Sequence, residues 1–140
     1  MVEWDILSKE DIKRIQGSFQ KLSGKQQETG DILYKHLFES NPDISKIFTG
    51  DMSEQARTFM RMIKTVVEGL NNVHIIMPAI QNMGSRHVDY GVKGEMFTHF
   101  KGSLMFALDK VLGSDFDSDT KASWSKLYDV MEELMKGSNY

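Results

Sequence analysis

Apolar residues recur at helical spacing along the whole of this 140-residue chain. Near the N-terminus Ile12, Ile15 and Phe19 share one stripe, and further along Phe59 and Ile63 do the same. No stretch of the sequence alternates apolar and polar residues in the period-two pattern of a strand. The chain has only two prolines, the residue that a helix interior tolerates least. The sequence therefore predicts an all-α fold with about six substantial helices.

Several predicted helix ends carry recognisable signals. Ser8 followed by Asp11 three residues later is typical of a capping box. Pro42 can open a short helical turn, since its fixed backbone angle suits a first helical position. We expect Ser53 to cap a long helix, and the last helix to open near Asp117 or Ser118.

Length, charge and cysteine content limit the function classes. The chain is long enough for one domain with a sizeable core. Its net charge of −3 and its interspersed acids and bases give no reason to expect nucleic acid as a partner. Without cysteine it has no disulfide and no thiolate ligand. No targeting or membrane-spanning segment is evident, so we expect a cytoplasmic protein.

Acids at alternate positions near the last predicted helix imitate the start of a calcium loop. Asp115, Asp117 and Asp119 have the right spacing, but Thr120 and Lys126 occupy the positions where that loop needs Gly and Glu. We therefore expect these acids to favour the N-terminus of the following helix rather than to bind calcium.

His87 stands apart from the other three histidines because it lies on an apolar helix stripe. It follows Ile80 by seven residues and Met83 by four, so its ring should point into the core. From spacing alone two interpretations remain open. It is either a buried neutral histidine bonded to a backbone carbonyl or a ligand to a cofactor.

The segment around this histidine resembles a known family. The run from Met83 to Val92, with His87 followed by Tyr-Gly-Val, is similar to the proximal-histidine segment of globins. It is most similar to bacterial single-domain globins, flavohaemoglobin haem domains and the neuroglobin-like branch. Phe48 resembles the phenylalanine at a globin helix corner, and Trp124 with Tyr128 the aromatic signature of the last globin helix. The resemblance implies a single globin domain over residues 1–140, with six to eight helices enclosing haem b.

The resemblance also implies roles for particular residues. His87 would be the axial ligand to the haem iron, its other ring N–H donating to a backbone carbonyl. Gln55 falls 32 residues earlier, at the distal position, and Tyr34 faces it from the second helix. Both side chains could donate hydrogen bonds to a bound ligand. The apolar haem contacts would be Phe48, Phe59, Met83, Val92, Phe97 and Leu104, with Arg86 as a possible contact to a haem propionate.

Departures from the family pattern narrow the expected chemistry. Phe97 occupies the place of a flavohaemoglobin tyrosine that strengthens the proximal histidine, and Asn139 falls near that of its glutamate. Loss of that network weakens the case for peroxide chemistry. Gln55 replaces a distal histidine, so bis-histidine iron is not expected, although Tyr34 could still ligate ferric iron.

The resemblance implies reversible binding of O2, and of CO and NO, as the leading function. One alternative is nitric oxide dioxygenation, which would need a separate reductase because a chain of this length carries no flavin or nicotinamide domain. Another is a haem-based gas or redox sensor. Globins of similar sequence serve each of these roles, so the choice stays open here.

Overall fold

A computed structural model describes residues 7–48, 50–74, 76–78, 80 and 94–139, with side chains at the C-terminal end as far as residue 133. The described residues contain helices and no strand, which confirms the predicted all-α class. The residues described between 73 and 80 are also helical. The named helices are α1 (Lys9–Gln20), α2 (Gln26–Ser40), η2 (Pro42–Ile47), α3 (Met52–Glu68), α5 (Gly94–Leu112), η3 (Gly113–Asp115) and α6 (Ser118–Asn139).

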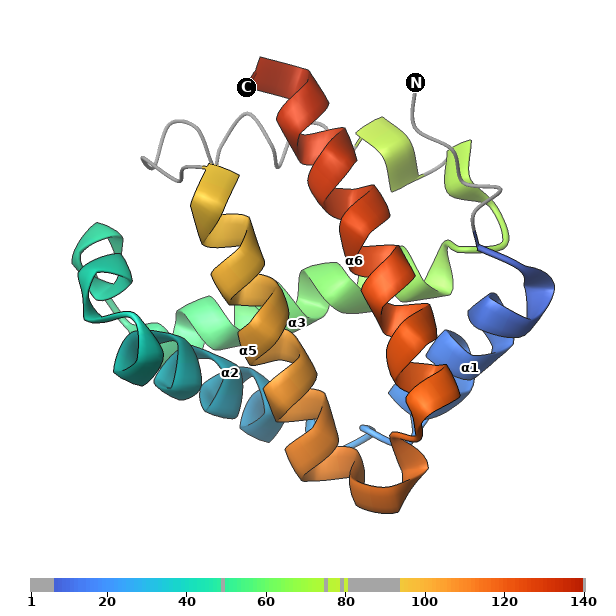
Figure 1. The fold of residues 1–140 in the computed structure, drawn as a ribbon, viewed down its shortest axis with the longest axis horizontal. Helices are drawn as coiled ribbons and strands as arrows, with labels where there is room; N and C mark the ends of the chain where they lie inside the picture. Colours follow the sequence, from blue (N-terminus) through green and yellow to red (C-terminus); the bar gives the residue numbers. More distant parts are fainter. Residues whose placement is uncertain (1–6, 49, 75, 79, 81–93, 140) are drawn as a thin grey trace.

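The helices pack in two linked groups. α2 packs against both α3 and α5, while α1 packs against α6 and α3. α5 also contacts α6, and α3 runs across behind this pair in Figure 1. The core between them is apolar and includes the fully buried Trp124, whose indole N–H donates to Ser18 Oγ over 2.9 Å. Among the described helices, none is long and apolar enough to cross a membrane.

Three of the predicted helix ends are confirmed. The N–H of Asp11 donates to Ser8 Oγ and the N–H of Ser8 donates to Asp11 Oδ2, each over 3.0 Å, so the capping box at α1 is complete. Pro42 opens the 3-10 helix η2. At α6, Asp117 Oδ1 accepts from the Thr120 N–H over 2.8 Å, which is the helix-capping role expected for the acids of this segment.

The predicted cap of α3 is wrong by two residues. The helix begins at Met52, so Ser53 already lies in its first turn and Asp51 stands at the N-cap. The Asp51 carboxylate accepts from the N–H groups of Ser53, over 2.9 Å, and Glu54, over 3.4 Å. Aspartate caps as well as serine does and also complements the helix dipole, so it takes the position.

Asp11 joins the two ends of the chain through a buried carboxylate, only 2% exposed. Its oxygens accept from Ser123 Oγ over 2.7 Å and from Lys126 Nζ over 3.2 Å, both on α6, besides the Ser8 N–H. Burial alone would raise the pKa of Asp11, but these three hydrogen bonds together hold it well below the ordinary value. The ionised carboxylate therefore stabilises the contact between α1 and α6.

Asp11→Asn is expected to lower the free energy of unfolding at neutral pH by about 1–3 kcal/mol, because a buried charged acceptor of three hydrogen bonds becomes a neutral one. A depressed folded-state pKa gives stability that is full above the unfolded value of about 3.9 and is lost as pH falls below it. The gap between the wild type and the variant should therefore narrow in acid. Urea unfolding over a pH series measures it, with Asp43→Asn, at an exposed pair with Lys46, as the control. A gap that stays constant down to the lowest pH would contradict the assignment.

The crossing of α2 and α3 depends on the absence of a side chain at Gly30. A Cβ there would lie 2.9 Å from the carbonyl oxygen of Ala56 and 3.0 Å from both Ala56 Cβ and Met60 Cγ. Tyr34 lies one turn after Gly30 and Gln55 lies next to Ala56. The close approach of the two backbones at this point therefore sets the distance between Tyr34 and Gln55.

Gly30→Ala is expected to destabilise the protein by about 1–3 kcal/mol, because the new methyl group presses on backbone that cannot simply rotate away. The matched control is Gly17→Ala, since a Cβ at Gly17 in α1 meets nothing within 4 Å. That control should gain about 0.5–1 kcal/mol from better helix propensity. Thermal unfolding of both variants measures the effects, and a shift of the same sign in both would refute the packing argument.

Candidate functional site

Tyr34 lies at the centre of an aromatic cluster where α2, α3 and α5 meet. Its side chain is only 4% exposed. Four phenylalanine rings surround it with centroids 5.6–6.0 Å from the centroid of the tyrosine ring, and three of these four contacts are edge-to-face. The rings are those of Phe38, Phe48, Phe59 and Phe100. The structure thus brings together Tyr34, Phe48 and Phe59, all three predicted as site residues.

The polar partner of Tyr34 is Gln55, near the start of α3. Gln55 Nε2 donates to Tyr34 Oη over 3.5 Å, at the long end of hydrogen-bond geometry. In this bond the tyrosine oxygen accepts, so its own hydrogen is not used. No described residue accepts a hydrogen bond from that hydroxyl. Tyr34 therefore presents a nearly buried O–H donor amid apolar rings.

The surroundings of Tyr34 disfavour ionisation of its phenol still further than usual. Burial raises the pKa of Tyr34 to about 12, and the hydrogen bond from Gln55 opposes this only in part. The phenol consequently stays neutral and keeps its hydrogen at every physiological pH. A tyrosine with a lower pKa could ionise and lose the donor, but this one remains a donor.

One stripe of α3 combines apolar character with partial exposure. Gln55, Phe59 and Met62 are only half-buried, whereas Ala56, Met60 and Ile63 on the neighbouring stripe are fully buried. Phe48, just after η2, is also half-buried. The apolar members, Phe48, Phe59 and Met62, form a wall beside the Tyr34–Gln55 pair. Other described residues cover this apolar wall only in part.

Phe97 and Leu104, two of the predicted apolar contacts, lie on α5. Both are buried, at 2% and 1% exposure, and with Phe100 they fall on one stripe of this helix. The carbonyl oxygen of Phe97 accepts from Tyr128 Oη on α6 over 2.6 Å, and burial raises the pKa of that phenol. Tyr128 thus holds the first turns of α5 in place.

The proximal half of the predicted site lies outside the described residues. It comprises Met83, Arg86, His87 and Val92. The other three histidines are described. His36 Nδ1 is 2.9 Å from Ser103 Oγ and its ring stacks on Phe106 at 4.1 Å, while His74 and His99 are exposed. The described part of the chain contains no group of three or more histidine, aspartate or glutamate side chains that could hold a metal ion.

The sequence did not single out Phe38 and Phe100 as site residues. Phe38 follows Tyr34 by one helical turn, so its place beside the tyrosine could have been found from helical spacing. Phe100 reaches Tyr34 only because α5 packs on α2, a contact between distant parts of the chain. No local signal in the sequence points to it.

Comparisons with known proteins identify the family and the fold. The globin family model matches residues 31–135. Neuroglobin of Tetraodon nigroviridis is 26% identical, and neuroglobin of Chaenocephalus aceratus 23%, each over 92% of this chain and 90% of the relative. The crystal structure of a hexacoordinated haem protein from an anhydrobiotic tardigrade has a TM-score of 0.86 at 18% identity, over 96% of each chain. Because the family model spans most of its length, this chain belongs to the globin family.

Proposed function

We propose that this globin is a haem b protein that reversibly binds O2, and also CO and NO, with residues 1–140 forming one globin domain. His87 would hold the iron from the proximal side, and Tyr34 with Gln55 would stabilise the ligand from the distal side. The globin family and the haem protein of similar fold support the cofactor. The contact between Gln55 and the buried Tyr34 supports the choice of distal residues, which the family resemblance implied.

The observation that carries the proposal is the Tyr34 hydroxyl. A buried donor without an acceptor costs about 1–3 kcal/mol, so a fold retains one where a ligand supplies the acceptor. No described residue accepts from this hydroxyl, and the neutral phenol keeps its hydrogen. A small ligand with partial negative charge is the acceptor that fits a donor among aromatic rings.

The described residues also fit a haem. Phe48, Phe59 and Met62 form a half-buried apolar wall. A flat aromatic macrocycle such as haem could pack against this wall and bury its own apolar surface there. When bound, haem supplies the iron at which diatomic gases coordinate. Tyr34 and Gln55 then orient the ligand, and the surrounding phenylalanines limit the access of water. Arg86 would contact a propionate.

Visible spectroscopy of the protein reconstituted with haem tests the proposal. Ferric, ferrous, O2 and CO spectra should show one haem per chain and reversible ligand binding. They also report whether ferric iron is five- or six-coordinate. A protein that takes up no haem, or whose ferrous spectrum is unchanged by CO, would refute the proposal.

Nitric oxide dioxygenation is the second candidate, favoured by the same pair of donors. The overall reaction, NO + O2 + e⁻ → NO3⁻, consumes one electron per turnover. The pair would orient O2 for attack by NO, and the electron would come from a separate reductase. Sustained NO consumption with an added reductase supports this function, whereas a single stoichiometric turnover would contradict it.

A further inference from the structure

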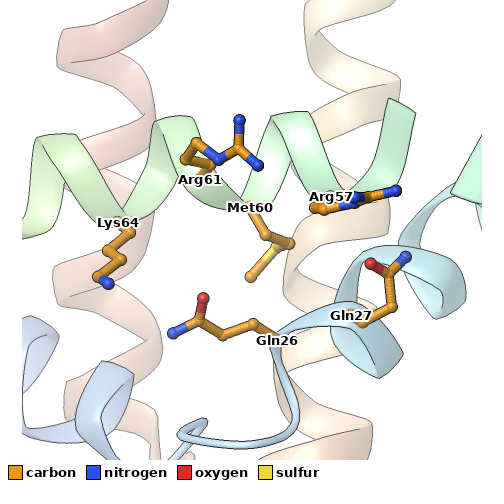
Figure 2. Close-up of a pocket in the computed structure, with 6 residues that line it drawn as sticks. All are labelled: Gln26, Gln27, Arg57, Met60, Arg61 and Lys64. Atoms are coloured by element: carbon orange, nitrogen blue, oxygen red, sulfur yellow. The ribbon is translucent and has the colours of Figure 1, made fainter. Parts of the chain in front are cut away.

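A shallow pocket lies between the start of α2 and the outer face of α3, away from the Tyr34–Gln55 pair. Its volume is about 160 Å³. Figure 2 shows Met60 at its centre, with two glutamines on one side and three cationic side chains along α3. The lining residues are Gln26, Gln27, Arg57, Met60, Arg61 and Lys64.

Three cationic side chains share one face of α3. Arg57, Arg61 and Lys64 are spaced by four and three residues, so they lie within two turns of each other. All three are exposed, and none forms an ion pair with a described residue. Like charges at this spacing repel one another. An anion bound beside them would relieve that repulsion.

The opposite wall of the pocket is also suited to an anion. α2 begins at Gln26 after Lys25, which provides no side-chain cap, whereas α1 and α3 are capped by Ser8 and Asp51. The positive end of the α2 dipole therefore adds to the cationic charge. Gln26 is half-buried, and its amide has no hydrogen-bond partner among the described residues. The acids Glu28, Asp31, Glu54 and Glu68 lie on the same two helices but do not line the pocket.

We propose that this pocket binds a phosphate anion that carries at least two negative charges. Arginine forks bind phosphate oxygens in pairs, and lysine adds a point charge. The pocket is smaller than the roughly 300–1,000 Å³ of sites for drug-sized ligands, so it suits the phosphate groups alone.

Figure 2 shows that the three cations fan out from α3 rather than meet at one point. A diphosphate carries more charge and more oxygens than a single phosphate, so it can contact more than one of these long side chains at once.

The site is independent of the proposed ligand site. Helical rotation of about 100° per residue places Arg57, Arg61 and Lys64 on the side of α3 opposite Gln55 and Phe59. Variants in the pocket should therefore leave the haem spectra and the O2 release rate unchanged. Failure of anion binding and failure of haem binding are consequently distinguishable in the same sample.

Titration of the full chain with inorganic pyrophosphate, by calorimetry and by phosphorus NMR at constant ionic strength, tests the proposal. We expect one site per chain, with affinity decreasing from pyrophosphate to phosphate to sulfate. The double variant Arg61→Gln/Lys64→Gln should weaken binding at least about tenfold, because it removes two charge-assisted contacts. Arg61→Lys keeps the charge but loses the forked guanidinium. Its affinity for pyrophosphate should lie between those of the wild type and the double variant.

The matched control is Lys13→Gln/Lys35→Gln, which removes the same charge at exposed positions outside the pocket. It should bind pyrophosphate as the wild type does. If both double variants bound pyrophosphate equally weakly, the effect would be one of overall charge, and the proposed site would be overturned. A nucleoside diphosphate is expected to bind no more tightly than pyrophosphate, because the pocket has room only for the phosphate groups. Much tighter binding of the nucleotide would contradict this. Circular dichroism confirms that each variant is folded.

Discussion

Tyr34→Phe should release O2 about 10–150-fold faster than the wild type, because one charge-assisted hydrogen bond of about 1.5–3 kcal/mol is lost. The substitution deletes a single oxygen atom from a ring already surrounded by four phenylalanines. The apolar packing is therefore kept while the donor disappears. Flash photolysis or stopped-flow displacement of O2 by CO measures the rate. CO carries less negative charge when bound, so its release should change much less.

The matched control for this prediction is Tyr128→Phe. It also removes one buried tyrosine hydroxyl, but that hydroxyl donates to the Phe97 carbonyl and not toward the distal pocket. We expect lower stability and an almost unchanged O2 release rate. Gln55→Leu should accelerate O2 release as well. If the two donors act on one ligand, this acceleration should be larger in the wild type than in the Tyr34→Phe background. An unchanged rate in Tyr34→Phe would remove this residue from the mechanism.

The all-α fold class and several helix ends could be predicted from the sequence because they depend on local chemistry. The capping box at Ser8 and the opening of η2 at Pro42 each involve residues within one turn. The start of α3 was harder, because Asp51 and Ser53 can both cap and only the observed first turn decides between them. Local rules leave such choices between good caps open.

Contacts between distant segments could not be predicted in the same way. The place of Phe100 beside Tyr34 requires the packing of α5 on α2, and the burial of Asp11 requires α6 to return to α1. The sequence showed Asp11 only as a helix cap. Likewise, acids and bases alternate along the sequence, yet helical rotation gathers three cations of α3 on one face. Residues that are mixed in the sequence can be segregated on the folded surface.

His87→Ala is expected to abolish stable axial ligation and to weaken haem retention by well over about tenfold. Loss of an outer partner of a metal ligand alone costs about 10–100-fold, and loss of the ligand itself costs more. The surroundings of the three described histidines do not suit an axial ligand. His36 is engaged by Ser103 and Phe106, and His74 and His99 are exposed. The absence of cysteine leaves no thiolate to replace the imidazole.

His74→Ala and His99→Ala are the controls for this last prediction, because each removes one imidazole from an exposed position. Both should retain haem and its ferrous CO spectrum. Free imidazole added to His87→Ala should restore the spectrum if the variant lost only the ligand. Restoration in a variant whose circular dichroism matches the wild type would separate a missing ligand from a damaged fold. An unchanged ferrous spectrum in His87→Ala without imidazole would instead assign the axial position to another side chain.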